Sequence, residues 1–272
     1  MWTAIYPWSR TLSDTTTTPD AGLTEAAALL RHARHAVALT GAGLSAESGI
    51  PTYRGSGGIW TRFGEPTIDG WDLFCADPAG WWRAALEHNA VGSEFAAAID
   101  SAVPNSGHLA LAELERMGHL AHVITQNIDN LHEDAGSRAV TEIHGNRRRV
   151  RCMNCGTRDR LEMISLDHLP PTCPECGGVL KNDTVMFGEP IPDDALRTCY
   201  RQAAAADLFL VIGTSAVVYP AASFPIMVRE RGMPLIEINP EPTELSHIAS
   251  VIVRAPAGVA LPALVELLRG ER

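Results

Sequence analysis

The stretch that decides the fold is residues 37–55, VALTGAGLSAESGIPTYRG. It begins inside the apolar run AVALT, which is typical of a short buried strand. Gly41 and Gly43 follow at once, and glycine allows both a tight turn and close approach of a ligand to the backbone. The next segment, with Ser45 and Ser48, can open a helix whose N–H groups suit a pyrophosphate. An alanine replaces the third glycine of G-x-G-x-x-G, so a tight strand–helix turn without a ligand is the alternative interpretation.

Apolar strands and helices alternate through much of the chain. Strands are expected at 36–40, 119–127, 207–213 and 234–239, and helices at 21–36, 106–118, 220–231 and 261–272. Strands that alternate with helices favour a parallel sheet covered on both faces. The sequence therefore predicts an α/β fold with a Rossmann-like, doubly wound parallel sheet.

Two stretches break this alternation and are expected to form a smaller domain. Residues 55–105 are rich in tryptophan and predict a helical insertion, and residues 147–190 hold paired cysteines and several prolines. The Rossmann-like domain is then assembled from 21–54, 106–146 and 191–272. Residues 1–20 are left as an N-terminal extension.

Small and polar residues follow two more of the expected strands. Gly213-Thr214-Ser215 comes after one strand, and Asn239-Pro240-Glu241 comes after the next. Ligands of open α/β sheets bind at the carboxyl ends of the strands, so three such ends suit a long ligand such as a dinucleotide. Ordinary turn chemistry is the alternative for each loop taken alone.

A dense polar loop, TQNIDNLHEDAG at 125–136, follows the strand before it. Its amides and carboxylates, among them Gln126, Asn127 and Asp129, can bind a ribose or a carboxamide by paired hydrogen bonds. A capped turn, in which these side chains bond their own backbone, is the alternative. His144 lies just before Gly145, and histidine is the usual proton acceptor near neutral pH.

Four cysteines form two C-x-x-C pairs separated by 17 residues: Cys152, Cys155, Cys173 and Cys176. This spacing is typical of a tetrahedral zinc site, and four thiolates leave no open position, so the zinc is expected to be structural. A redox dithiol is the alternative interpretation.

The formal net charge of -10 argues against general nucleic-acid binding, which needs clustered lysine and arginine. Apolar runs long enough for a membrane span are absent from the sequence, so no membrane association is expected. The first residues lack the basic start and apolar stretch of a secretory signal, which predicts a cytoplasmic protein and favours metal over disulfides. The alanine- and arginine-rich composition suggests a bacterial enzyme.

Together these motifs resemble the sirtuins, the NAD-dependent protein-lysine deacylases. The resemblance is carried by GAGLSAESGIPTYRG, TQNIDNLH, the IHG around His144, the paired C-x-x-C, VMFGE at 185–189, GTS at 213–215 and IN at 238–239. They occur in the family's order over roughly residues 24–268. The resemblance implies a Rossmann-like domain with a smaller lobe that combines a zinc module and a helical module.

The resemblance also implies roles for individual residues. His144 matches the general base, and Asn127 and Asp129 are implied to share the catalytic site with it. Residues implied to bind NAD are Gly41, Ala42, Gly43, Ser45, Glu47, Tyr53, Arg54, Trp60, Gln126, Asn127, Ile128, Asp129, Gly213, Thr214, Ser215, Asn239, Glu241 and Ala257. The substrate peptide and acyl-lysine are implied to contact Val185, Phe187, Gly188 and Glu189. Tyr53 replaces the family's usual phenylalanine, which keeps the ring and adds a hydroxyl.

The implied reaction moves an acyl group from a lysine of a protein or peptide to the ADP-ribose part of NAD, releasing nicotinamide, free lysine and O-acetyl-ADP-ribose. Family members that remove succinyl or malonyl groups carry a Tyr-x-x-Arg pair, where this chain has Ala85 and His88. We therefore expect neutral acyl groups, acetyl first, with longer neutral chains as an option. Mono-ADP-ribosyl transfer or NAD hydrolysis, and NAD sensing without turnover, are the rival functions.

Overall fold

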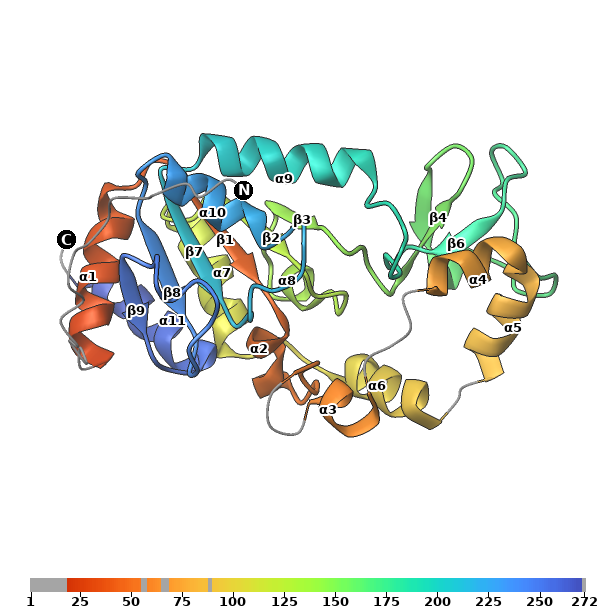
Figure 1. The fold of residues 1–272 in the computed structure, drawn as a ribbon, viewed down its shortest axis with the longest axis horizontal. Helices are drawn as coiled ribbons and strands as arrows, with labels where there is room; N and C mark the ends of the chain where they lie inside the picture. The colour runs from red at the N-terminus through yellow and green to blue at the C-terminus, as the bar shows by residue number, and fades with distance from the viewer. Residues whose placement is uncertain (1–18, 55–57, 65–68, 88–89, 271–272) are drawn as a thin grey trace, which may run out of the picture.

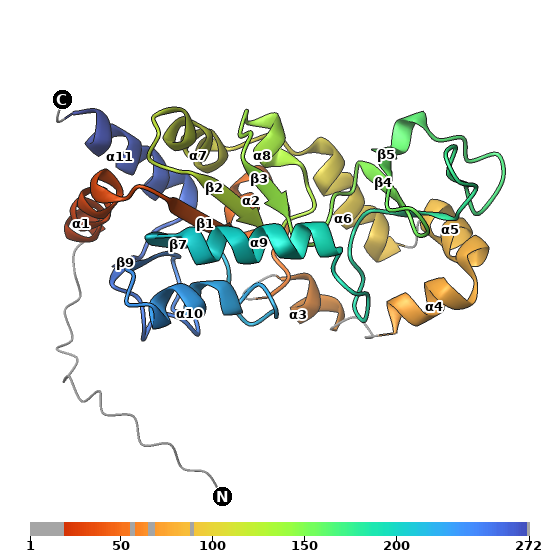
Figure 2. The same cartoon turned by 90° about the horizontal axis from the view of Figure 1, so that it is seen from above.

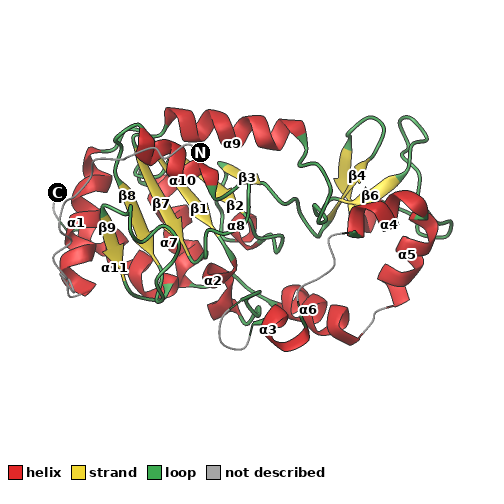
Figure 3. Ribbon diagram, viewed as in Figure 1, coloured by secondary structure: helices red, strands yellow, loops and turns green. Residues whose placement is uncertain are grey.

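The large sheet has six parallel strands in the order β3-β2-β1-β7-β8-β9. The computed structural model describes residues 19–54, 58–64, 69–87 and 90–270. The strands are β1 (Ala36–Thr40), β2 (His122–Thr125), β3 (Val140–Glu142), β7 (Leu208–Ile212), β8 (Leu235–Ile238) and β9 (Val251–Val253). The chain winds outward from β1 to one edge and from β7 to the other, so the order reverses between these two strands (Figures 1 and 3). That reversal is where an open α/β sheet forms its ligand crevice.

Helices cover both faces of this sheet, as Figure 2 shows from above. They are α1 (Pro19–His32), α7 (Ser106–Arg116) and α11 (Ala257–Arg269) on one face, and α9 (Asp193–Ala205) and α10 (Ser223–Glu230) on the other. Side chains alternate along each strand, so Ala38 packs with the first group and Leu39 with the second. A run that is buried throughout, such as LFLVI in β7, packs against helices on both faces of the sheet. Continuous apolar runs were therefore sufficient to predict this fold, and the prediction is confirmed.

A three-stranded antiparallel sheet, β5-β4-β6, lies at the other end of the molecule (Figure 1). Its strands are β4 (Arg149–Cys152), β5 (Arg158–Arg160) and β6 (Leu180–Asn182), and the 3-10 turn Leu161–Met163 directly follows β5. The predicted helical insertion, 55–105, gives α3 (Ile59–Phe63), α4 (Gly70–Ala76), α5 (Pro78–Glu87) and α6 (Ala90–Ser101). Trp82 of α5 connects these helices to the small sheet, because it packs on Val150 and its indole N–H donates to the carbonyl of Leu180 at 2.9 Å.

The helices and strands differ from the sequence predictions at a few ends. The last helix begins at Ala257 rather than at residue 261, since Pro262 is tolerated inside it. The proline leaves the carbonyl of Gly258 without its helical donor, and the hydroxyl of Ser106 donates to that carbonyl at 2.7 Å instead. The three-residue strands β3 and β9 were not predicted, because so short a run carries no readable periodicity.

The segment after the glycine turn is also shorter than a full helix. It forms one turn, α2 (Ala42–Ser45), then a 3-10 turn (Ala46–Ser48) that ends at Gly49 with φ of 86°. A second one-turn helix, α8 (Leu131–Asp134), follows β2. Among the residues that the structure describes, no helix combines the length and apolar character needed to cross a membrane.

Candidate active site

A cavity of about 1210 Å³ lies at the carboxyl ends of β1 and β7, where the strand order reverses. Most of the predicted site residues line it, although they come from segments far apart in the sequence. They are Gly41, Ala42, Gly43, Glu47, Tyr53, Arg54, Trp60, Gln126, Asn127, Ile128, His144, Val185, Phe187, Gly188, Glu189, Gly213, Thr214, Ser215, Asn239 and Glu241. The fold thus brings the predicted cofactor and substrate residues to one continuous space.

The glycine turn after β1 packs directly on the turn after β7. The N–H of Gly43 donates to the carbonyl of Gly213 at 2.7 Å, and a Cβ on Gly41 would lie 2.6 Å from the Cβ of Thr214. The N–H of Gly41 donates to Ile212. Both amides are therefore engaged in hydrogen bonds within the protein. The glycines are required because two turns share one small space.

The polar loop after β2 is fixed by a chain of buried hydrogen bonds. Asn127 Nδ2 donates to the carbonyl of Gly41 at 3.0 Å and to Ser45 Oγ at 2.9 Å. The Ser45 hydroxyl donates in turn to Asp129 Oδ2 at 2.6 Å, and the other oxygen of Asp129 accepts the N–H of Leu131 at 3.0 Å. Local capping and long-range contacts therefore occur together, and the turn after β1 is tied to the loop after β2.

A second, much smaller cavity lies beside the first. It is lined by Ser45, Asn127, Asp129 and Tyr53, together with apolar residues that include Phe95. Tyr53 lines both cavities, and its ring packs at tilted angles against Trp60 and Phe95, with centroids 5.2 and 5.7 Å away. Burial, and then the nearby charge of Asp129, raise the pKa of the Tyr53 hydroxyl to about 12. Tyr53 is thus a neutral wall between the two spaces at any physiological pH.

His144 presents one ring nitrogen to the cavity in a defined state. Its Nδ1 lies 3.2 Å from the carbonyl oxygen of Gln126. A carbonyl can only accept, so Nδ1 carries the hydrogen and Nε2 is the basic nitrogen. Burial lowers the pKa of His144, and the bond to Gln126 opposes this only in part. The imidazole is therefore neutral near pH 7 and able to take up a proton.

The loops after β7 and β8 are joined to the same network. The side-chain amide of Gln126 donates to Thr214 Oγ1 at 2.9 Å, and that of Asn239 donates to the carbonyl of Thr214 at 3.2 Å. Below them lies an ion pair that sequence reasoning missed: Arg254 donates to the fully buried carboxylate of Glu237. The same guanidinium donates to the carbonyl of Asn239 at 3.3 Å. A glutamate inside the apolar strand LIEI was the available signal.

The segment predicted to contact substrate, 185–189, forms a turn beyond the end of β6. The N–H of Val185 donates to the carbonyl of His144 at 2.8 Å, so this turn and the histidine are directly linked. Phe187 is 43 % exposed, whereas the side chain of Glu189 is buried and ion-paired with Lys181 and Arg151. Lys181 was not predicted, because nothing in the sequence distinguishes it from a surface lysine.

Three predicted residues do not line the large cavity. Ser45 and Asp129 line only the smaller one. Ala257 lines neither, because its side chain is 4 % exposed and packs in the core at the start of α11. His88, considered for acyl recognition, lies outside the described residues, and Ala85 is exposed on α5 away from the cavity.

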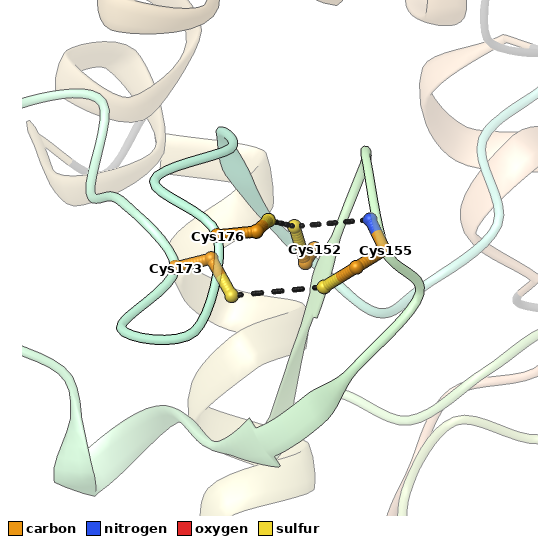
Figure 4. A group of neighbouring side chains, drawn as sticks. All are labelled: Cys152, Cys155, Cys173 and Cys176. Carbon is orange, nitrogen blue, oxygen red and sulfur yellow. Dashed lines mark hydrogen bonds between the residues drawn. The ribbon is translucent and has the colours of Figure 1, made fainter.

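The four cysteines converge between β4 and the turn at 173–176 (Figure 4). All four sulfurs lie within 4.8 Å of one another, with 3.5 Å between Cys152 and Cys176 and 3.8 Å between Cys155 and Cys173. A tetrahedron with metal–sulfur bonds of about 2.3 Å has edges of about 3.8 Å, so the donor set fits zinc. A Cβ at Gly178 would lie 3.0 Å from the sulfur of Cys152, so the cluster also requires that glycine.

The strand order β3-β2-β1-β7-β8-β9 becomes 3-2-1-4-5-6 when the strands of this sheet alone are numbered along the chain. With a cavity at the point of reversal, this order defines a Rossmann-like protein of the dinucleotide-binding class. The profile of the Sir2 family matches residues 41–220. The chain belongs to the Sir2 family, and the sirtuin resemblance is confirmed.

The two relatives named here come from archaea, so they give no support to the bacterial assignment. The chain is 46 % identical over 238 residues to NAD-dependent protein deacylase 2 of Pyrobaculum aerophilum, covering 88 % of this chain and 92 % of that protein. It is 44 % identical over 250 residues to the NAD-dependent protein deacetylase of Caldivirga maquilingensis, covering 90 % and 93 %. Among solved structures, a Sir2 homolog–NAD complex matches with a TM-score of 0.74 at 42 % identity, covering 90 % and 93 %. A Sir2 mutant with a deacetylated peptide and 3′-O-acetyl-ADP-ribose matches with a TM-score of 0.74 at 34 % identity, covering 90 % and 97 %.

Proposed function

We propose that this protein is an NAD-dependent protein-lysine deacylase that removes neutral acyl groups, acetyl first. The observation that carries the proposal is the single cavity shared by His144, the turn at 184–189 and the loops after β1 and β7. In this proposal a two-part ligand and a modified side chain would meet in this space beside one basic nitrogen, Nε2 of His144. The relatives named deacylase and deacetylase, and the solved complexes with NAD and with peptide, support the same function.

In this proposal NAD is a co-substrate that the cavity fits by size and by donor set. The amides of Gln126 and Asn239, the hydroxyls of Thr214 and Ser215 and the guanidinium of Arg54 can donate to phosphates, hydroxyls and a carboxamide. When bound, NAD supplies a nicotinamide that leaves and a ribose that accepts the acyl group.

His144 is the proposed general base. Its Nδ1–H is held by the carbonyl of Gln126, so Nε2 stays available to accept a proton from a ribose hydroxyl. Asn127 and Asp129 are proposed to orient the reacting end of the co-substrate. Their bonds to Ser45 fix both side chains before any ligand arrives, which lowers the cost of ordering the site.

Zinc is proposed as a structural metal held by the four cysteines. Two of them, Cys152 and Cys173, are buried, and Cys152 belongs to β4 itself. Zinc would cross-link β4 to the turn at 173–176 and so support a sheet of only three short strands.

The division into domains is proposed as the sequence suggested it. The six parallel strands fall within 21–54, 106–146 and 191–272, and β4, β5 and β6 fall within 147–190. Helices α3 to α6 fall within 55–105. The proposed extension, 1–20, lies almost wholly outside the described residues.

The acyl preference follows from the lining of the cavity near the 184–189 turn. Val185, Met186, Phe187, Ile191 and Leu196 are apolar, and no arginine or lysine other than Arg54 lines the cavity among the described residues. A carboxylate on the acyl chain would lack the bidentate partner that such groups require. Acetyl and longer neutral chains are therefore favoured over succinyl or malonyl.

The test is a panel of acyl-lysine peptides incubated with and without NAD and analysed by mass spectrometry. Deacylation gives O-acetyl-ADP-ribose and free lysine only when NAD is present. Free or protein-bound ADP-ribose without loss of the acyl group would indicate hydrolysis or ADP-ribosyl transfer instead. Faster turnover of succinyl-lysine than of acetyl-lysine would contradict the acyl preference. His144→Ala should keep NAD binding and lose turnover, and an active variant would remove His144 from the mechanism.

A further inference from the structure

Lys181, on β6, is a fully buried lysine, with 0 % of its side chain exposed. Its Nζ lies 3.0 Å from Glu189 Oε2 and donates to the carbonyls of Asn182 at 2.8 Å and Thr184 at 2.6 Å. All three ammonium hydrogens therefore have acceptors. Lysine is almost never fully buried without a partner, so this position demands a physical explanation.

Glu189 completes the contact from the other end of the turn. Its side chain is 1 % exposed, Oε2 also accepts the N–H of Met186 at 2.9 Å, and Oε1 accepts from Arg151 at 2.5 Å. The backbone N–H of Glu189 donates to the carbonyl of Met186 at 3.1 Å. The ion pair thus holds the carbonyl of Thr184 at the start of the 184–189 turn and the N–H of Met186 in its middle, while Glu189 itself is the last residue of the turn.

All six residues of this turn line the large cavity. The turn contacts the proposed base through Val185, whose N–H donates to the carbonyl of His144. It also contacts α4, because the N–H of Trp71 donates to the carbonyl of Phe187 at 3.3 Å. The shape of the turn therefore affects the wall of the cavity and one backbone contact of His144.

The charges around the pair are balanced. Arg151 bridges Glu189 and Asp183, and Arg158 bridges Asp183 and Asp194, at distances from 2.5 to 3.0 Å. Removing Lys181 alone would leave a buried excess of negative charge, whereas removing the charges of Lys181 and Glu189 together would keep the balance. Buried ion pairs often add little net stability compared with neutral side chains of similar shape, so stability alone does not explain them.

We propose that Lys181 and Glu189 are positioning residues that fix the 184–189 turn in the shape that receives the acyl-lysine peptide. The inference rests on the proposed function, because that function makes this turn the peptide-binding wall. It predicts that the pair determines affinity for the peptide and has little effect on affinity for NAD, whose loops are held by other contacts.

The experiment compares wild type with the double variant Lys181→Met/Glu189→Gln. Fluorescence anisotropy of a fluorescein-labelled acetyl-lysine peptide gives the peptide Kd, calorimetry gives the NAD Kd, and thermal unfolding monitors the fold. Met cannot donate to the two carbonyls, and the loss of two hydrogen bonds should weaken peptide binding about tenfold. The NAD Kd should stay within about twofold. Arg160→Met is the matched control, because its ion pair with Glu162 is in the same lobe but 75 % and 69 % exposed.

The inference is overturned if the folded double variant binds peptide as tightly as wild type, or if peptide and NAD affinities fall together. The single variant Glu189→Gln is a second test, because it preserves the shape of the side chain, and its peptide Kd is measured in the same way. Its single oxygen cannot serve both Arg151 and Met186, so weaker peptide binding is again expected, and unchanged binding would overturn the inference. Wild type that binds peptide but forms no O-acetyl-ADP-ribose would refute the proposed function and leave the role of the pair intact.

Discussion

Gly213 is a position where a single added methyl group should severely disrupt the packing of two turns. It adopts φ of 59°, and a Cβ there would lie 2.7 Å from the carbonyl carbon of Gly43, which is backbone and cannot rotate away. Gly213→Ala should cost about 1 kcal/mol for the left-handed conformation and about 1 kcal/mol for the lost bond from Gly43. The two turns must also move apart to make room for the methyl group, which costs at least about 1 kcal/mol more. We therefore expect the free energy of unfolding to fall by about 3 kcal/mol or more.

Gly49→Ala is the control for this substitution. Gly49 has φ of 86°, but a Cβ there would meet nothing within 4 Å, so only the conformational cost of about 1 kcal/mol applies. Urea unfolding of both variants measures the difference, and titration with NAD should show weaker binding for Gly213→Ala alone. Equal destabilisation by the two substitutions would refute the packing argument for the glycine turn.

Three further predictions concern zinc and pH. A strong chelator should release about one zinc per chain and lower the midpoint of thermal unfolding. If protein purified without zinc unfolds at the same temperature as the zinc-bound protein, the metal is not structural. The deacylation rate should rise with pH about a midpoint below 6.5, the ordinary pKa of histidine, because burial lowers the pKa of His144 and its neutral form is the base; a midpoint above 6.5 would contradict this. Burial also lowers the pKa of His108, His122 and His132, to about 4, 4 and 3. The unfolded chain then binds more protons as pH falls through 6.5, so stability should fall between pH 7.5 and 5.5. Burial raises the pKa of Glu142 to about 7, so this group binds its proton more tightly in the folded protein and opposes the loss of stability. The net decrease in the free energy of unfolding between pH 7.5 and 5.5 is then on the order of 2 kcal/mol. Urea unfolding at the two pH values measures it, and greater stability at pH 5.5 would reverse the argument.

Short-range patterns in the sequence predicted most of the residues that line the cavity. Apolar runs that end in glycine or amide residues predicted the strand ends, and the cysteine spacing predicted the cluster of four sulfurs. The order of the motifs then predicted that His144 and Asn127 belong to the same site, although neither residue alone indicates a site. Ala257 was assigned to NAD by the same reasoning and does not line the cavity, because resemblance fixes a position in the chain but not the direction of a side chain.

The sequence by itself determined the doubly wound sheet, the cysteine cluster and the family, because each depends on spacing along the chain. Only the tertiary structure decided why Gly41 and Gly43 must be glycine, since the space they share belongs to Gly213 and Thr214, about 170 residues away. Only it revealed the pairs Lys181–Glu189 and Glu237–Arg254, because a buried charge looks like a surface charge until its partner and its burial are known. Contacts between distant segments are set by packing, and local pattern contains no record of them.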